Sequence, residues 1–406
     1  MGRPHQIDAE WLVAAIDRLS EIGRDQNGGV TRLPFSLDDM KARDLVSEWM
    51  RESGLSVVRD PAGNDIGTLP GSEAVSAIAV GSHTDTVPNG GRYDGALGVL
   101  VGIAAVRALK QSGTVLRHPI EVINFVAEEA TLPGGTVGSR AMTGALAEEY
   151  LSRTGWDDRL ISKLLLDAGI DPVGLLHASR AESPPCCFVE LHIEQGATLE
   201  QRGIQVGVVE GIVGIRRFEA EFPGSANHAG TTPMASRDDA LRKAAPIIES
   251  VASIAVRLNT VGTVGTVRVV PNAPNVIPGH AILGIEFRAL ESALLDEATS
   301  LLDTACRAAG GHIKQVSNKA PVRSDPRMLL AFDRAVAECG VTSLHMPSGA
   351  GHDAMCMADI CPQAMLFVPS KDGISHAFHE YSSPEQCITG ANVLLQALIA
   401  LDSTFI

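Results

Sequence analysis

The chain has 406 residues and a formal net charge of −15 at pH 7. Nucleic acids and anionic membranes select for basic surfaces, so this charge argues against both as partners. Hydrophobic residues make up 45% of the chain and charged residues 20%, which is ordinary for a globular protein. The length is typical of about two domains.

The sequence carries no sign of a membrane or secretory protein. Its longest apolar run, residues 96–106, is shorter than the roughly 20 residues that a membrane helix needs. The first residues include no apolar stretch of the kind found in secretory signals, so we expect a cytoplasmic protein. The seven cysteines are an odd number without a CxxC pair, and we expect no disulfide framework.

The first predicted elements are two helices. Asp8 precedes an amphipathic run that extends to Ile22, and Ser36 precedes a second run that ends near Gly54. Apolar strands and helices then alternate, which predicts an α/β domain with a mostly parallel central sheet. The predicted strands are residues 75–80, 120–127, 187–191 and 364–368, and the helices among them include 97–110 and 141–151.

A different order of elements occupies residues 211–322. A strand, a helix, two strands, a helix and a strand follow one another, which is the β-α-β-β-α-β order of a ferredoxin-like α+β unit. We therefore expect two domains. Residues 1–210 and 323–406 form the first, and residues 211–322 form a second domain inserted into it.

Polar residues follow the first of the apolar strands. His83 and Asp85 come after the strand that ends at Val80, and Asp94 stands in a Gly-rich turn before the next helix. Open α/β sheets bind their ligands at the carboxyl ends of the strands. Taken alone, however, Asp94 could be a helix cap and His83 a polar turn residue.

The other three strands end in the same way. Glu128 and Glu129 follow the second strand, His192 ends the third, and His376 follows the fourth. Adjacent carboxylates repel each other unless a cation or a shared proton compensates. One of the two glutamates can bind a metal while its neighbour stays free as a general base. A solvated acidic loop is the alternative interpretation of this pair.

Taken together, the strand ends predict a metal centre. Two borderline divalent ions such as Zn²⁺ suit this set of nitrogen and oxygen donors, with one carboxylate between them. Ions about 4 Å apart can share a hydroxide and polarise a carbonyl group. Asp85 is spaced to accept the ring N–H of His83. The HExxH, P-loop and GxSxG motifs are absent, and the HxE at residues 192–194 lacks the PCxxC of zinc deaminases.

The motifs around these residues closely resemble one known family. They are GSHTDTVPNGGRYDGALGVL, AEE followed by GSR, ELHIEQG and GISHAFHEYSSPEQ. Together they are similar to the amidase and carbamoylase branch of the M20 metallopeptidases, which includes N-carbamoyl-L-amino-acid hydrolases, β-ureidopropionases of the bacterial and yeast type, and allantoate amidohydrolases. The resemblance extends from about residue 8 to residue 400. It implies a di-metal catalytic domain and an inserted lid domain that also forms a homodimer.

The resemblance also implies a role for each residue of the predicted centre. It assigns His83 and His192 to one ion, Glu129 and His376 to the other, and Asp94 to a position between them. The two ions would be zinc first, with manganese or cobalt as alternatives. Of the two adjacent glutamates, the resemblance makes Glu128 the general base.

The remaining implied residues would bind the substrate. His228, in a Gly-rich loop, matches the lid histidine that polarises the substrate carbonyl, usually across the dimer interface. Arg288 would hold the substrate carboxylate, with Asn275 hydrogen-bonding nearby. Gln195 would orient the carbamoyl group. Without the resemblance, His228 would be interpreted as a turn residue.

The sequence therefore predicts an amidohydrolase that cleaves a linear amide or ureido C–N bond in a small, anionic N-carbamoyl or N-acyl amino acid. A metal-bridging hydroxide would attack the carbon, and Glu128 would act as the general base. An exopeptidase or deacylase of the same family, and a metal-binding protein without catalysis, are the alternatives. Where many relatives read EEGSRF, this chain has Ala130 to Gly135 after the glutamate pair, and this departure leaves the preferred substrate open.

Overall fold

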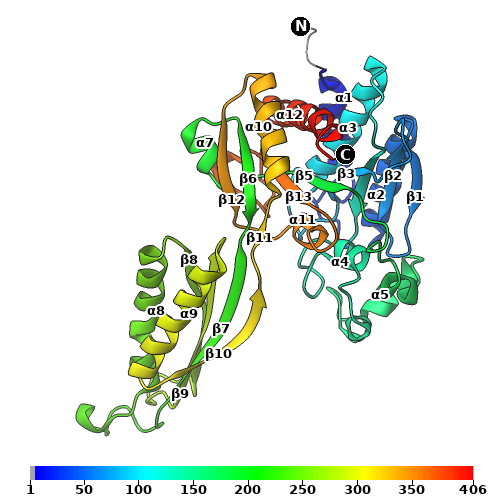
Figure 1. Ribbon diagram of the computed structural model, residues 1–406. Helices are drawn as coiled ribbons and strands as arrows, with labels where there is room; N and C mark the ends of the chain where they lie inside the picture. Colours follow the sequence, from blue (N-terminus) through cyan, green and yellow to red (C-terminus); the bar gives the residue numbers. More distant parts are fainter. Residues whose placement is uncertain (1–4, 406) are drawn as a thin grey trace. The chain divides into compact units, whose positions relative to one another are not determined.

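The computed structural model describes residues 5–405. It divides into two compact units, as Figure 1 shows. The first unit joins the residues up to Glu210 with those from Ser324 onward, and the second unit is Gly211–Arg323.

The larger sheet has nine strands in the order β1-β2-β4-β3-β5-β13-β6-β11, with β12 paired to β6. Its central strands β4, β3, β5 and β13 run parallel to one another, whereas β1, β2, β6 and β11 pair antiparallel with their neighbours. The sheet is therefore mixed, and the expectation of a mostly parallel sheet holds only at its centre. The strands are β1 (Ser56–Arg59), β2 (Asp65–Leu69), β3 (Ile78–His83), β4 (Ile120–Phe125), β5 (Cys187–Ile193), β6 (Val206–Ile212), β11 (Val322–Arg323), β12 (Ser343–Ser348) and β13 (Gln363–Val368).

The parallel centre of the sheet is covered on both faces. Every residue of β3, β4, β5 and β13 is buried, which is typical of parallel strands between two helical layers. Alternate residues such as Val80 and Val189 join the main hydrophobic core. This core includes helices α1 (Ala9–Ser20), α2 (Leu37–Glu52), α3 (Ala96–Ser112), α10 (Pro326–Cys339) and α12 (Pro384–Asp402).

The intervening residues of the same strands face the opposite side, because side chains alternate along a strand. His83 and His192 are among them, each at or near the end of its strand. Short helices lie on that side of the sheet in Figure 1, α4 (Val137–Thr143) and α11 (Asp353–Met357). A smaller core packs α4 against α5 (Ile161–Asp167) and α6 (Pro172–Leu176).

The prediction of a helix over residues 141–151 is wrong in its bounds. Helix α4 ends at Thr143, because Gly144 adopts a left-handed conformation with φ 77° and caps it. A separate 3₁₀ turn then covers Glu148–Ser152. The hydrophobic pattern continues across this break, which is why the sequence reads as one helix.

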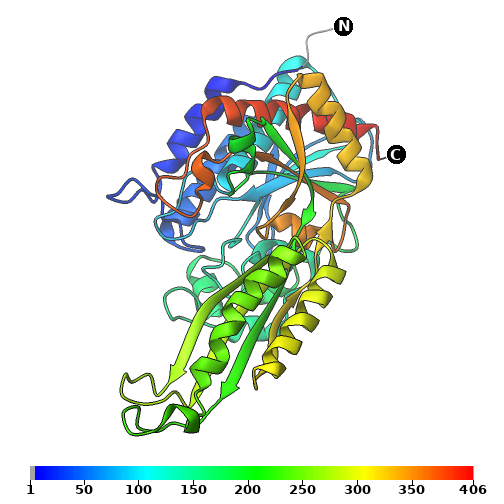
Figure 2. The same cartoon turned by 90° about the vertical axis from the view of Figure 1, so that its left-hand side faces the viewer.

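The second unit is a four-stranded antiparallel sheet with two helices. Its strand order is β10-β7-β9-β8, and Figure 2 shows both helices on one face of the sheet. The core between the layers is apolar and includes Phe218, Phe222 and Phe287. The elements follow the order β7 (Gly214–Pro223), α8 (Ala240–Arg257), β8 (Val261–Val270), β9 (His280–Ala289), α9 (Ser292–Ala308) and β10 (His312–Lys319).

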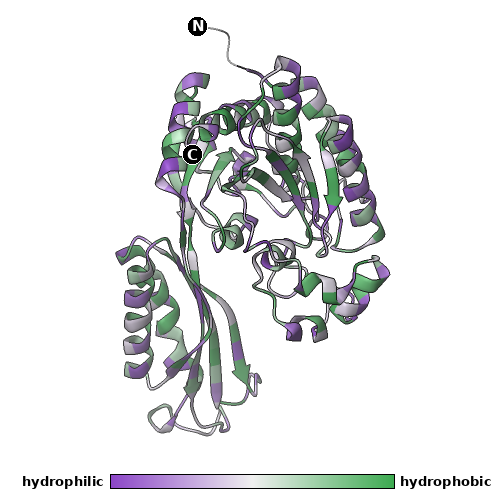
Figure 3. Cartoon of the chain, turned by 45° about the vertical axis from the view of Figure 1, so that its right-hand side comes forward, coloured by the Kyte–Doolittle hydropathy of each residue, from purple (hydrophilic) through white to green (hydrophobic). Residues whose placement is uncertain are grey.

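Hydropathy follows this layering. Figure 3 shows hydrophobic residues concentrated in the strands of the larger sheet, while the helices carry both hydrophobic and hydrophilic residues. Within residues 5–405, none of the helices has the length and apolar character required to span a bilayer.

Candidate functional site

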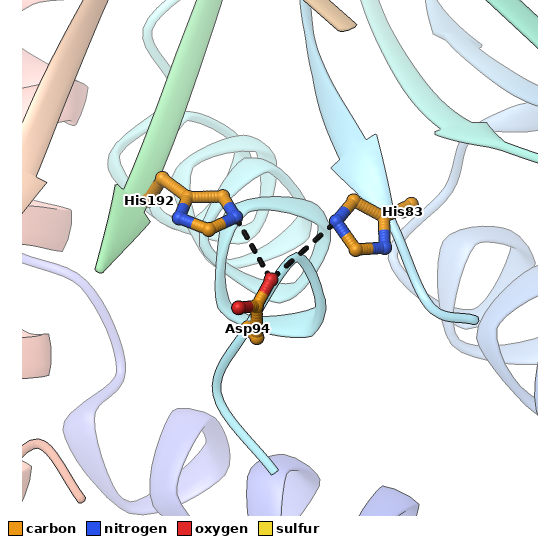
Figure 4. Close-up of side chains that lie close together, drawn as sticks. All are labelled: His83, Asp94 and His192. Carbon is orange, nitrogen blue, oxygen red and sulfur yellow. Dashed lines mark ion pairs between the residues drawn. The ribbon is translucent and has the colours of Figure 1, made fainter. Parts of the chain in front are cut away.

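Two histidines and an aspartate meet at the carboxyl ends of β3 and β5. The two strands are parallel neighbours, so His83 and His192 arrive at the same edge of the sheet. Asp94 lies in the turn before α3, and Figure 4 shows its carboxylate between the two imidazole rings. Its Oδ1 atom is 3.6 Å from Nε2 of His83 and 3.2 Å from Nε2 of His192. All three side chains are buried.

The second oxygen of Asp94 faces another pair of donors. Asp94 Oδ2 lies 3.4 Å from Nε2 of His376, and this nitrogen lies 3.5 Å from Oε1 of Glu129. Glu129 is buried, whereas the His376 side chain is half-exposed. The structure thus brings together the five residues expected to bind metal, in two groups that share Asp94.

Main-chain oxygens fix the orientation of both buried rings. Nδ1 of His83 is 3.0 Å from the carbonyl oxygen of Asp85, and Nδ1 of His192 is 2.9 Å from that of Ile193. A proton on each Nδ1 donates to its carbonyl, so Nε2 is the ring nitrogen that can bind a metal. This is the arrangement that a metal-binding histidine needs. Nε2 of His192 also accepts the main-chain N–H of Gly95, at 3.1 Å.

The carboxylate of Asp85 has a different role from the one expected. Its Oδ1 atom is 3.7 Å from the His83 ring, beyond hydrogen-bonding distance. Instead, its two oxygens accept the main-chain N–H groups of Glu128 and Glu129, each at 3.1 Å. The main chain of Asp85 therefore orients the histidine, while its side chain holds the turn that carries both glutamates.

Carboxylates crowd this buried site. Burial raises the pKa of Glu129 to about 8, with Asp94 adding to the effect and His376 opposing it. Burial also raises the pKa of Glu128 well above its usual range, and the nearby Asp353 adds to this. For Asp94 burial acts in the same direction, but His192 outweighs it and holds the pKa well below its usual range. Cations placed between these groups would stabilise the ionised carboxylates.

The donors fit two divalent ions. One group offers two imidazole nitrogens and a carboxylate oxygen, and the other offers one nitrogen and two carboxylates. Zinc and similar ions are bound by such mixed nitrogen and oxygen sets. A third group, formed by Glu190, His192 and His352, is less suitable. Glu190 already accepts from the hydroxyl of Ser82 and a main-chain N–H group, so its oxygens are occupied.

Two further residues of the first unit lie at this site. Glu128 lies outside these donor groups, and its Oε2 atom is 3.6 Å from Nε2 of His83. Gln195 donates from Nε2 to Oδ2 of Asp94 at 2.7 Å. Because the amide nitrogen is fixed in this way, Oε1 of Gln195 is left as a buried acceptor without a hydrogen-bond partner.

The three remaining predicted residues lie in the second unit. Nδ1 of His228 accepts the main-chain N–H groups of Gly230 and Thr231, at 3.0 and 3.2 Å. Asn275 lies beside this loop, since its carbonyl accepts the N–H of Ala229. Arg288 is on β9, where its Nε donates to Glu286 at 2.6 Å.

The sequence did not single out Ser375 or Glu380, although both contact the site. The hydroxyl of Ser375 lies 2.7 Å from Oδ2 of Asp94, and Glu380 accepts the main-chain N–H of Asp94. Their positions in the GISHAFHE segment, next to His376, were the only available signal.

The chain is similar to known proteins over most of its length. Residues 79–400 match the model of peptidase family M20/M25/M40. An N-carbamoyl-L-amino acid amidohydrolase of Geobacillus stearothermophilus is 40% identical over 397 residues, covering 96% of this chain and 97% of that protein. The allantoate amidohydrolase of Bacillus subtilis is 35% identical, covering 95% and 96%. The crystal structure of a hydantoinase/carbamoylase family amidase from Burkholderia multivorans is 35% identical, with a TM-score of 0.90 and coverage of 99% and 98%.

Proposed function

Because the chain belongs to peptidase family M20/M25/M40, we propose that it hydrolyses a linear C–N bond in small N-carbamoyl or N-acyl amino acids. The observation that carries this proposal is the pair of donor groups that share Asp94, with the Glu128 carboxylate beside them. Relatives that match almost the whole chain are named amidohydrolases, which supports the same class of reaction.

The five donors would hold two divalent ions, with zinc the first choice and manganese or cobalt the alternatives. Such ions supply Lewis acidity, which makes a bound water a stronger acid and polarises a carbonyl group. Glu128 would accept the proton of the attacking water and deliver it to the departing nitrogen. Its carboxylate is available for this exchange because it lies outside both donor groups, with Oε2 3.6 Å from Nε2 of His83.

Gln195 supports a ureido substrate. Its buried Oε1 atom has no donor in the structure, and an unpaired buried acceptor is costly. The terminal NH₂ of a carbamoyl group would supply that donor, whereas a simple acyl group has no N–H at the same position. We therefore favour N-carbamoyl amino acids over N-acyl amino acids.

The second unit would complete the substrate site. Nε2 of His228 would donate to the carbonyl oxygen, since Nδ1 already accepts two main-chain N–H groups. Arg288 would bind the carboxylate of the amino acid, with Asn275 as a further hydrogen-bonding group. We propose a homodimer in which the partner subunit provides the lid histidine.

The decisive experiment is turnover of N-carbamoyl, N-acetyl and dipeptide substrates by metal-loaded protein, for wild type and for Glu128→Gln. We expect the N-carbamoyl substrates to be hydrolysed fastest. Loss of the base should reduce kcat by about 10²- to 10⁴-fold. Metal content should not change, because Glu128 is outside the donor groups. Glu182→Gln, on the exposed surface, is the matched control.

Each other outcome has a defined meaning. Preference for dipeptides or N-acetyl amino acids would identify an exopeptidase or deacylase. Absence of any hydrolysis after chelation and reloading with Zn²⁺, Mn²⁺ or Co²⁺ would indicate a metal-binding protein without catalysis. Substantial activity in Glu128→Gln would remove this residue from its role as general base.

A further inference from the structure

Glu380 connects two segments that are almost 290 positions apart in the sequence. It lies four residues after His376, in the loop before α12, and is only 4% exposed. Its Oε1 atom accepts the main-chain N–H groups of Tyr93 and Asp94, at 3.0 and 3.1 Å. One buried carboxylate oxygen therefore holds the main chain at the residue shared by the two donor groups.

The other oxygen of Glu380 reaches the side chain of the same aspartate through a serine. Oε2 of Glu380 is 3.0 Å from the hydroxyl of Ser375. That hydroxyl is 2.7 Å from Oδ2 of Asp94, the oxygen that faces His376. Glu380 thus fixes Asp94 twice, directly at its main chain and indirectly at its carboxylate.

The absence of a side chain at residue 91 is an independent sign of this arrangement. A Cβ atom on Gly91 would lie closer than 3.0 Å to the carboxylate, and also to the Cβ atom, of Glu380. Real Cβ atoms do not approach other atoms so closely, so any larger residue would displace Glu380. The missing side chain at Gly91 therefore leaves the space that the Glu380 side chain occupies beside the turn before Asp94.

We propose that Glu380 is a positioning residue for the metal pair, which holds the shared ligand Asp94 in place relative to His376. This inference rests on the proposed function, since it requires that the five donors bind metal. Outer partners of metal ligands fix the orientation of those ligands, and their removal typically weakens metal binding about 10- to 100-fold.

The hydrogen-bond geometry predicts which substitutions are tolerated. The hydroxyl of Ser375 has one proton but faces two carboxylates, those of Asp94 and Glu380. In Glu380→Gln, Oε1 still accepts the two main-chain N–H groups, and the amide nitrogen can donate to Ser375. Glutamine should therefore replace glutamate. Glu380→Asp is too short to reach both segments, and Glu380→Ala removes the connection.

The test measures metal binding directly. Metal-free wild type, Glu380→Ala and Glu380→Gln are titrated with Zn²⁺ in competition with a chromogenic chelator, and the absorption spectrum of each Co²⁺-loaded protein is recorded. We expect Glu380→Ala to bind at least one ion about 10- to 100-fold more weakly, with an altered Co²⁺ spectrum. Glu380→Gln should keep the affinity and the spectrum of wild type. Glu385→Ala, an exposed glutamate five residues away, is the matched control.

Wild-type affinity and an unchanged Co²⁺ spectrum in Glu380→Ala would overturn the inference, and so would equal losses in the alanine and glutamine variants. If Glu380→Ala does not fold, as judged by circular dichroism, Ser375→Ala tests the same connection. It should weaken metal binding, and unchanged affinity would count against the inference. A wild-type protein that binds no divalent ion would refute the proposed function itself, which separates the two failures.

Discussion

Gly95, the first residue after the shared donor Asp94, offers a sharp test of how the donors are packed. Its backbone has φ 65° and ψ −52°, a combination that residues with a side chain rarely adopt. A Cβ atom at this position would also lie closer than 3.0 Å to several atoms of the His83 ring. Gly95→Ala therefore combines backbone strain with a clash against a buried imidazole.

The expected cost follows from these two effects. The strained backbone costs about 1–3 kcal/mol. Overpacking against the His83 ring, which is buried and anchored through Nδ1, adds about 1–3 kcal/mol. We therefore expect the free energy of unfolding, measured with urea, to fall by roughly 2–6 kcal/mol. Because the ring must move away from Asp94, we also expect loss of one of the two proposed ions after dialysis, measured by mass spectrometry.

Gly113→Ala is the matched control. Gly113 caps the other end of the same helix α3 with φ 70°, and a Cβ atom there would meet no atom within 4 Å. This variant has backbone strain alone, about 1–2 kcal/mol, and should keep both ions. If Gly95→Ala does not differ from Gly113→Ala in stability and retains its full metal content, neither stability nor metal binding depends on the close approach of Gly95 to the His83 ring. That result would refute our reasoning.

Two further predictions concern protons and buried charge. Burial and Asp94 raise the pKa of Glu129 to about 8, and a hydrogen bond to Asp94 raises that of His376 to about 9, so both are largely protonated at pH 7 without metal. Metal affinity should therefore rise from pH 7 to pH 9, and binding at pH 7 should release protons, which calorimetry in buffers of different ionisation enthalpy detects; a pH-independent affinity would contradict this. Arg43 donates to three main-chain oxygens and pairs with Asp65 at 3.1 Å, fully buried. Arg43→Met should lower the free energy of unfolding by about 3–5 kcal/mol in urea, and a loss below about 1 kcal/mol would show that the pair is dispensable.

The family, and the meeting of the five predicted donors at one edge of the sheet, were predictable from the sequence. The motifs indicated the M20 family, and the family match and the amidohydrolase relatives confirm that prediction. The site was predictable because polar residues interrupt four apolar strands at their ends. Side chains at the carboxyl ends of adjacent parallel strands must meet, as His83 and His192 do.

Contacts that depend on loop geometry were not predictable in the same way. Spacing alone placed the carboxylate of Asp85 near His83, because the two residues are two positions apart. In the structure the chain leaves the strand after His83, and the carboxylate turns toward the main chain of Glu128 and Glu129. Glu380 was not identified for a related reason, since its partners lie on a segment far away in the sequence.

The sequence pattern also did not predict whether the outer strands pair parallel or antiparallel. Strand β2 alternates buried and half-buried residues, which parallel and antiparallel pairing both permit, and it pairs antiparallel with β4. The strands β3, β5 and β13 are mostly apolar and gave a clearer signal, because a parallel centre with helices on both faces buries such strands completely. The predicted parallel pairing is therefore found at the centre of the sheet, where complete burial of a strand constrains its direction.

Burial also determines the chemistry of the site. Buried carboxylates are costly unless a cation or a proton compensates, and this site gathers Asp85, Asp94, Glu128 and Glu129 at one edge of the sheet. The buried guanidinium of Arg43 is hydrogen-bonded to main-chain oxygens and paired with Asp65. Burial raises the pKa of Asp85 to about 6, and it outweighs Arg43, which lowers that pKa. Protons compensate in the metal-free chain, as the raised pKa values of both glutamates show. Two divalent ions would compensate more completely, and would leave Glu128 as the carboxylate that ligates neither ion and can exchange a proton.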